Sequence, residues 1–247
     1  MKKTAEILLD MLYPKKCPLC HQILREKNSL VCPDCFQKAI PMKEPLCMKC
    51  GRPVRMEEEY CQDCRSGVHH FTEGRSIFPY GEIWRQSLVR FKYYGCREYG
   101  DFYAKAISIY GRKYLERWKP QLIVPVPLHS RKKRMRGFNQ AAYLAERVSR
   151  FTGIPWSDNL VIKIRNTKSQ KKLNASQRKK NLRNAYLVTR KITGFSVLVV
   201  DDVYTTGSTM DAMAMCLQEA GAKDVYFLTV CAAVSYTHLT LPTKRIV

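Results

Sequence analysis

From about residue 71 onward, short apolar runs alternate with longer stretches in which apolar and polar residues follow a helical period. The apolar runs are rich in Val, Ile and Phe, which is typical of buried strands. They predict strands over residues 75–80, 121–128, 159–164, 195–202 and 224–233. The stretches of helical period predict helices over residues 82–94, 99–118, 139–153 and 208–222. Strands that alternate with helices predict an α/β fold, in which a mostly parallel sheet is covered by helices on both faces.

Residues 1–70 follow a different pattern, because they are rich in Cys, Pro and charged residues and contain no long apolar run. Residues 1–14 predict a short amphipathic helix rather than a secretory signal, since Glu6 and Asp10 interrupt the apolar run. No segment of the sequence approaches the roughly 18 apolar residues that a membrane-spanning helix needs. We therefore expect a cytoplasmic protein with reduced cysteines.

The last thirteen residues, 235–247, do not continue the pattern of strands and helices. Their sequence, SYTHLTLPTKRIV, is similar to translated sequencing-adapter read-through, so we interpret them as a non-native tail. The chain then divides into a Cys-rich module over residues 1–70, an α/β domain over residues 71–234 and this tail.

Eight of the eleven cysteines form four Cys-x-x-Cys pairs in the N-terminal module. The pairs are Cys17 with Cys20, Cys32 with Cys35, Cys47 with Cys50, and Cys61 with Cys64. Two such pairs complete a tetrahedral thiolate site for Zn²⁺, and a module this small needs a metal to stabilise it. We therefore predict two structural zinc sites rather than disulfides or redox dithiols. Similar spacing favours two sequential sites, although interleaved pairing also fits the sequence. The nearby His21, His69 and His70 are interpreted as surface residues rather than ligands.

The formal charge of +22 falls to about +18 when two four-thiolate zinc sites are filled, so a large basic surplus remains. Such a surplus favours an anionic partner, either nucleic acid, an anionic membrane surface or a phosphorylated small molecule. Between Arg131 and Arg183 there are sixteen Lys and Arg residues and only two acids. One phosphorylated small molecule needs far fewer cations, so this belt is a candidate surface for nucleic acid. Its first candidate contacts are Lys132, Lys133, Arg134 and Arg136, and the alternative is a solvated basic face.

The sequence VLVVDDVYTTGST, residues 197–209, predicts a site for a sugar phosphate. A buried strand ends at Asp201 and Asp202 and is followed by a turn into a helix, where backbone N–H groups bind anions. Gly207 allows close approach of the backbone, and hydroxyls surround it at Thr205, Thr206, Ser208 and Thr209. The two carboxylates suit the hydroxyls of a ribose, or Mg²⁺ held directly or through water.

This stretch resembles the thirteen-residue phosphoribosyl pyrophosphate (PRPP) motif of type I phosphoribosyltransferases, with four apolar residues, two acids and a Thr/Gly-rich loop. Residues 123–145 resemble the segment that distinguishes the ComF family, whose members are linked to natural competence. Residues 164–186 resemble the mobile loop of that family and of amidophosphoribosyltransferases, and a Cys-rich N-terminal module is also typical of the family. The resemblance covers nearly the whole chain apart from the tail. It implies a type I phosphoribosyltransferase fold preceded by a double zinc ribbon.

The resemblance also implies roles for individual residues. Residues 128–131 would form the pyrophosphate loop, namely Leu128, His129, Ser130 and Arg131. Thr167, Gln170 and Arg178 would lie on the loop that closes over the reacting ribose, with Asp201, Asp202 and Arg178 as the catalytic residues. Lys, Arg and Mg²⁺ would stabilise the departing pyrophosphate, so the reaction would need no protein nucleophile.

Two functions remain open from the sequence. The first is a Mg²⁺-dependent phosphoribosyltransferase that binds PRPP and acts in DNA uptake on an unknown acceptor. The second is a non-catalytic competence factor that binds single-stranded DNA and keeps the fold as a scaffold. A competence helicase or other uptake proteins are further partners that the resemblance implies. A PRPP-sensing regulator of gene expression is the weaker alternative, since no helix-turn-helix segment is evident.

Overall fold

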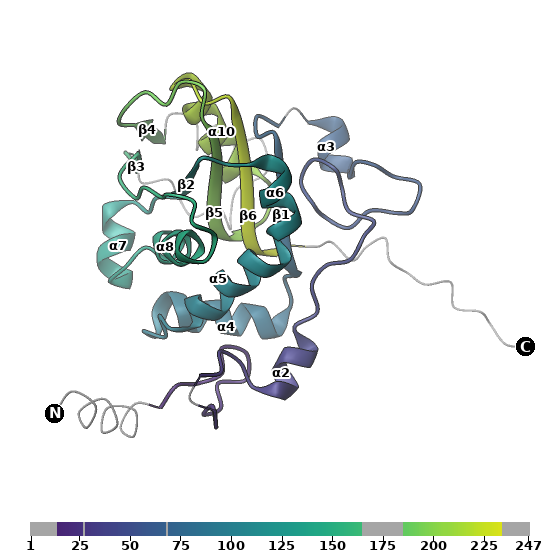
Figure 1. Ribbon diagram of the computed structural model, residues 1–247, viewed down its shortest axis with the longest axis vertical. Coiled ribbons are helices and arrows are strands. Elements are labelled where there is room, and N and C mark those ends of the chain that lie inside the picture. Colours follow the sequence, from purple (N-terminus) through teal and green to yellow (C-terminus); the bar gives the residue numbers. More distant parts are fainter. Residues whose placement is uncertain (1–13, 27, 68, 165–184, 234–247) are drawn as a thin grey trace, which may run out of the picture.

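The computed structural model describes residues 14–26, 28–67, 69–164 and 185–233 (Figure 1). The helix expected near the N-terminus and the tail over 235–247 therefore lie outside the described residues. The same holds for three predicted site residues, Thr167, Gln170 and Arg178.

The centre of the molecule is a four-stranded, fully parallel sheet with the strand order β1-β6-β5-β2. The strands span Glu73–Pro79 (β1), Asp224–Ala232 (β6), Ser196–Tyr204 (β5) and Leu122–Pro125 (β2). The predicted parallel sheet is thus confirmed. The strand expected over 121–128 ends at Pro125, and Pro127 beyond it has no N–H to continue the ladder.

One predicted strand does not join this sheet. Residues 159–164 contribute only β3 (Val161–Lys163), which pairs antiparallel with β4 (Tyr186–Val188) in a separate two-stranded sheet. The pattern did not predict β4, because three residues are too few to show a strand period.

The helices that pack on the sheet follow the predicted positions with one exception. They are α4 (Glu82–Tyr93), α5 (Tyr99–Tyr110), α6 (Arg112–Trp118), α8 (Gln140–Thr152) and α10 (Ser208–Glu219). The prediction of a single helix over residues 99–118 is wrong, since this segment divides into α5 and α6 at Gly111. This glycine packs tightly, because a Cβ atom there would lie 2.4 Å from the Ile107 carbonyl oxygen and 3.0 Å from Leu228 Cδ1.

Both faces of the sheet are covered, as the alternation along β5 shows. Leu198 and Val200 pack in a core with α4, α5 and α8, whereas Val197 and Val199 pack in a second core with α10. Figure 1 shows these helices around the strands of the sheet. The prediction of a sheet between two helical layers is therefore confirmed.

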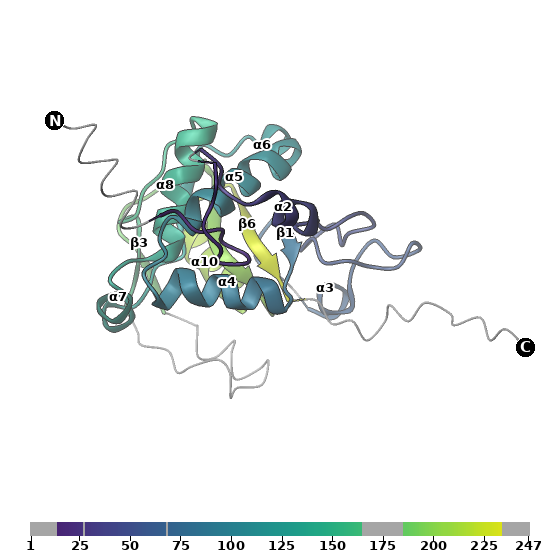
Figure 2. The ribbon, with the colours of Figure 1, turned by 90° about the horizontal axis from the view of Figure 1, so that it is seen from below.

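Each half of the Cys-rich module docks on a different one of these two cores. The first ribbon, residues 16–38, includes α2 (Pro33–Lys38), and its Cys17, Leu19 and Cys35 join the core of α4 and α5. The second ribbon, residues 46–66, includes α3 (Gln62–Ser66), and its Cys47 and Cys50 join the core of α10. Figure 2 shows α2 and α3 as separate elements at the side of the domain that carries β1.

Candidate functional site

The phosphate loop, residues 205–207, leaves the carboxyl end of β5 and leads directly into α10. The strand runs to Tyr204, and Ser208 and Thr209 lie in the first turn of α10, so the turn is shorter than predicted. Gly207 has a φ of 80°, and a Cβ atom there would lie 2.8 Å from Tyr204 Oη and 3.1 Å from His69 Cε1. Only glycine fits this position without strain. The loop therefore presents the N-terminus of a twelve-residue helix at the carboxyl ends of the parallel strands.

The two adjacent acids have different surroundings. Asp202 is buried, and its carboxylate forms an ion pair with Lys92 of α4. Gln140 Nε2 of α8 donates to Asp202 Oδ1 at 3.5 Å. Burial alone would raise the pKa of Asp202, but the Lys92 ammonium holds that pKa below its ordinary value. Asp202 is thus an ionised carboxylate committed to a contact inside the protein.

Asp201 is the acid on the partly exposed side of β5, and its Oδ1 accepts the backbone N–H of Asp202 at 2.9 Å. Burial raises the pKa of Asp201 well above its ordinary value, and the charge of Asp202 raises it further. Lys163 at the end of β3 faces the same site, where burial and the charge of Lys132 lower its pKa to about 8 while Asp201 opposes this shift. Asp201 and Lys163 therefore influence each other electrostatically near the carboxyl end of β5.

Lys92, Gln140 and Lys163 were missed as site residues. Lys92 lies on a helix about 110 residues before Asp202 in the sequence, and no local pattern links the two. Lys163 did leave a signal, because a lysine interrupts the apolar run of residues 159–164.

The predicted pyrophosphate loop is only partly a loop. Residues 126–129 are irregular, and Ser130 and Arg131 already belong to α7 (Ser130–Arg136), a helix that the sequence did not predict. His129 is the N-cap of this helix, and its Nδ1 accepts the Arg131 backbone N–H at 3.3 Å. Leu128 and His129 remain in the segment between β2 and α7. Because β2 and β5 are parallel, this segment leaves the sheet at the same end as the phosphate loop.

The four candidate nucleic-acid residues of α7 also differ from one another. Lys133 and Arg134 are exposed, whereas Lys132 is half-buried. Arg136 is half-buried as well, and it donates to Gln140 Oε1 at 2.9 Å and to the Tyr93 hydroxyl at 2.7 Å. Because Gln140 contacts Asp202, Arg136 supports the buried acid rather than presenting a free charge.

The eight paired cysteines form two groups of four thiols, in the sequential arrangement. The members are Cys17, Cys20, Cys32 and Cys35 in the first group, and Cys47, Cys50, Cys61 and Cys64 in the second. Within each group all Sγ atoms lie within 4.8 Å of one another, with 3.8 Å between Cys20 and Cys32 and 3.6 Å between Cys50 and Cys61. A tetrahedral zinc ion with bonds of about 2.3 Å requires sulfur atoms about 3.8 Å apart, so both groups fit zinc.

The histidines belong to neither thiol group. His21 Nδ1 contacts the hydroxyl of Tyr99, which is buried in the core. His69 is not a surface residue as predicted, because its side chain is only 9% exposed and its Nδ1 lies 2.8 Å from Asp211 Oδ2 of α10. Among the described residues, no helix is long and apolar enough to cross a membrane.

Two protein-family models match different parts of the chain. Residues 8–65 match the double zinc ribbon domain, and residues 102–241 match the phosphoribosyl transferase domain. The chain is 29% identical to the DNA utilization protein YhgH of Salmonella typhimurium over 88% of its own length and 97% of the relative. It is 30% identical to competence protein F of Haemophilus influenzae over 85% of its length and 93% of the relative. It is 29% identical to competence protein ComFC of Bacillus subtilis, with 80% of this chain and 82% of the relative covered.

Proposed function

Because the chain belongs to the ComF family, whose members combine a phosphoribosyltransferase fold with a zinc ribbon, we propose that it binds PRPP with Mg²⁺ at the carboxyl ends of β5 and β2. We further propose that it transfers the phosphoribosyl group to an acceptor during the handling of incoming single-stranded DNA in the cytoplasm. The observation that carries the proposal is the phosphate loop at the start of α10, next to the partly exposed Asp201.

The phosphate loop and the first turn of α10 would bind the 5′-phosphate through backbone N–H groups. The hydroxyls of Thr206 and Ser208, 2.9 Å apart, are available to the same anion. Asp201 would accept hydrogen bonds from the ribose hydroxyls or hold Mg²⁺ directly or through water, and the ion would neutralise the pyrophosphate as it leaves. The sequence predicts a catalytic role for Asp202 beside Asp201, but its carboxylate is paired with Lys92. We therefore propose that Asp202 keeps the end of β5 in place and that Asp201 is the acid that contacts the ligand.

Two predicted groups of residues complete the proposal. Leu128, His129, Ser130 and Arg131 would bind the pyrophosphate from the segment that joins β2 to α7. Thr167, Gln170 and Arg178 belong to the chain between β3 and β4, whose paired residues Lys163 and Tyr186 both interact electrostatically with Asp201. We therefore propose that Thr167, Gln170 and Arg178 act on the reacting ribose.

The alternative function is binding of single-stranded DNA without phosphoribosyl transfer. Support comes from the exposed Lys133 and Arg134 on α7 and from the relatives, which are named for DNA utilization and competence. The two functions predict different outcomes when the sugar-phosphate site is disabled.

The test is calorimetric titration of PRPP with Mg²⁺ into the zinc-loaded chain and its Asp201→Asn variant. Loss of charge-assisted hydrogen bonds to the ribose should weaken binding by roughly 10- to 100-fold. Asp158→Asn, at an exposed acid, is the matched control and should bind like the unaltered chain.

Two results would contradict the proposal. One is the absence of PRPP binding by the folded, unaltered chain, which would leave DNA binding as the function. The other is equal binding by the unaltered chain and Asp201→Asn, which would place the ligand elsewhere.

A further inference from the structure

The second ribbon touches the phosphate loop through one side chain. Arg52 follows Cys50 by two residues, and its Nη2 donates to the backbone carbonyl of Thr205. Its Nη1 lies 2.6 Å from Oδ2 of Asp63, which sits in α3 between Cys61 and Cys64. The Arg52 guanidinium also lies over the ring of Tyr204, 5.1 Å from its centroid. One arginine thus joins the zinc-binding turn, the short helix of the ribbon and the end of β5.

Arg52 has little freedom to leave this position. Its carbonyl oxygen accepts the Cys47 backbone N–H at 2.7 Å, and the Gly51 N–H donates to the Cys47 carbonyl at 2.9 Å. The backbone of Arg52 is therefore part of the turn that presents the thiols. Its side chain is only 16% exposed, because it is enclosed between Asp63 and Tyr204.

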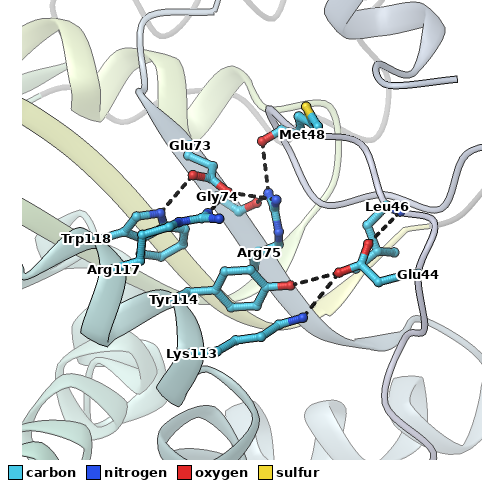
Figure 3. Close-up of polar contacts among 10 residues, drawn as sticks. All are labelled: Glu44, Leu46, Met48, Glu73, Gly74, Arg75, Lys113, Tyr114, Arg117 and Trp118. Carbon is cyan, nitrogen blue, oxygen red and sulfur yellow. Dashed lines mark hydrogen bonds and ion pairs between the residues drawn. The ribbon is translucent and has the colours of Figure 1, made fainter.

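The ribbon itself is fixed to the α/β domain at the free edge of β1. The Gly74 N–H donates to the Lys49 carbonyl at 2.8 Å. Arg75 Nη1 donates to the Met48 carbonyl at 3.1 Å (Figure 3). Arg75 is buried and lies 2.7 Å from Glu73. Its guanidinium lies over the ring of Tyr114 of α6. These contacts anchor the second ribbon to the edge strand β1 and to α6.

The same network continues into α6, which strengthens the support. Glu73 also accepts from Arg117 and from Trp118 Nε1, the latter at 2.8 Å (Figure 3). Just before the ribbon, Glu44 lies 3.2 Å from Lys113 Nζ (Figure 3). A displacement of the ribbon would therefore break several charge-assisted contacts at once.

The chain that leaves the ribbon supports the loop from a second point. His69 leaves no room for a side chain at Gly207, because a Cβ atom there would lie 3.1 Å from His69 Cε1. His69 itself is held by Asp211 of α10 and is stacked on the buried Phe71. The phosphate loop is thus contacted at Thr205 by the ribbon and at Gly207 by the segment that follows it.

We infer that the second ribbon is a structural part of the PRPP site and that Arg52 is a positioning residue for the phosphate loop, an inference that rests on the proposed function. In a planar trans peptide, the carbonyl of one residue and the N–H of the next point in opposite directions. A Thr205 carbonyl held toward Arg52 therefore turns the Thr206 N–H away from the ribbon, as a donor for phosphate. Arg52 also places a positive charge behind a loop that receives an anion.

The first ribbon provides the contrast, because it packs on α4 and α5 and its described residues make no hydrogen bond or ion pair with the phosphate loop. Its Pro18 carbonyl accepts from Ser87 of α4. Since the two ribbons share one ligand chemistry but differ in position, only the second should affect PRPP binding.

The test compares Arg52→Met, Arg52→Lys and the control Arg65→Met by PRPP titration and zinc content. Arg65 lies in the same ribbon, is 53% exposed and pairs with Glu58 at 3.3 Å. Arg52→Met should keep two zinc ions per chain and bind PRPP roughly 10-fold or more weakly. Arg52→Lys should recover part of this loss, because it keeps the charge but not the two-pronged contact. Arg65→Met should bind like the unaltered chain.

A second measurement separates this inference from the proposed function. Amide hydrogen exchange over residues 203–212 without ligand should be faster in Arg52→Met than in Arg65→Met, whether or not PRPP is the ligand. Unchanged exchange and unchanged binding in Arg52→Met would overturn the inference. Failure of the unaltered chain to bind PRPP would instead overturn the proposed function. If Arg52→Met loses zinc, the test is repeated with Asp63→Asn, which weakens the ion pair to Arg52 without changing Arg52 itself. PRPP titration and amide hydrogen exchange of this variant then decide whether Arg52 positions the phosphate loop.

Discussion

At the scale of single residues, the two adjacent acids are separated by the alternation of a strand. Asp202 follows Leu198 and Val200 on the face covered by α4 and α8, where it meets Lys92. Asp201 lies on the opposite face, near Lys163 and Tyr186. The sequence indicates an acidic pair, but only the fold shows that Asp202 is paired with a buried lysine, whereas Asp201 forms no ion pair among the described residues.

Replacing Lys92 should lower the stability of the protein, because the buried Asp202 carboxylate would lose its ion-pair partner. Lys92→Met leaves the Asp202 charge without a partner and should lower the free energy of unfolding by about 3–5 kcal/mol, measured by urea denaturation. The double variant Lys92→Met with Asp202→Asn removes both charges and should recover most of the loss. Asp202→Asn alone completes the comparison. If the losses of stability in Lys92→Met and Asp202→Asn simply add in the double variant, Lys92 and Asp202 are not a coupled pair.

The free energy of unfolding of the same variants should also depend on pH, in a direction that the pKa of Asp202 predicts. The folded pKa of Asp202 lies below its unfolded value, so its contribution to stability is present above the unfolded pKa and is lost as pH falls through the folded pKa. The deficit of Lys92→Met should therefore shrink at acid pH, where Asp202 becomes protonated.

Lys163 predicts a pH dependence of ligand binding. Its pKa of about 8 means that the free protein loses this positive charge as pH rises from 7 to 9. An anionic ligand binds the protonated form better, so PRPP affinity should fall over this interval. Lys163→Arg, which stays charged, should bind with an affinity that changes less with pH, measured by calorimetry. Lys191→Arg, at an exposed lysine, is the control, and an equal slope for all three proteins would exclude Lys163 from the site.

At the scale of elements, the sequence predicted the helices that have a clear hydrophobic period and missed the helix that has none. Helix α8 was predicted to end at Gly153, and the structure confirms this end, with Asn139 accepting the Ala141 N–H at the start and Gly153 at a φ of 74°. Helix α7 was missed because its residues, SRKKRMR, contain only one apolar side chain and so show no amphipathic period. Its stop signal, Gly137 at a φ of 76°, is present but is uninformative without that period.

Helix α7 carries the prediction for nucleic acid. Lys133→Gln with Arg134→Gln should weaken binding of single-stranded DNA, measured by fluorescence anisotropy over a range of salt concentrations. If both side chains contact phosphates, the slope of log affinity against log salt should fall by about 1.4, or about 0.7 for each contact. Arg136 stays unchanged in this variant, because its loss would disturb Gln140 and Tyr93.

The matched control for α7 is Arg190→Gln with Lys191→Gln, which removes two exposed charges elsewhere. An equal loss of slope in both double variants would mean that net charge, rather than the α7 surface, controls DNA binding.

At the scale of the whole molecule, the sequence predicted the components and not their assembly. The four Cys-x-x-Cys pairs and the PRPP motif are local patterns, so their chemistry could be recognised from adjacent residues. The supporting contacts join distant parts of the chain, as Arg52 with Thr205 and Lys92 with Asp202 do. Such pairs depend on how elements pack, which no local pattern specifies.

The separate docking of the two ribbons leads to a prediction about zinc. Cys20→Ser and Cys64→Ser each remove one thiolate, from the first and the second group respectively, and each should lower the zinc content from two ions to one per chain. Both should also lower the thermal unfolding temperature, because Cys17 and Cys47 are core residues on opposite sides of the sheet. PRPP binding should differ between the variants, since α3 holds Asp63 against Arg52. No such link to the phosphate loop is found for the first ribbon within residues 16–26 and 28–38. Cys20→Ser should retain PRPP affinity, and Cys64→Ser should lose it. Equal affinities in two variants that have each lost one zinc ion would show that the phosphate loop keeps its shape without the second ribbon.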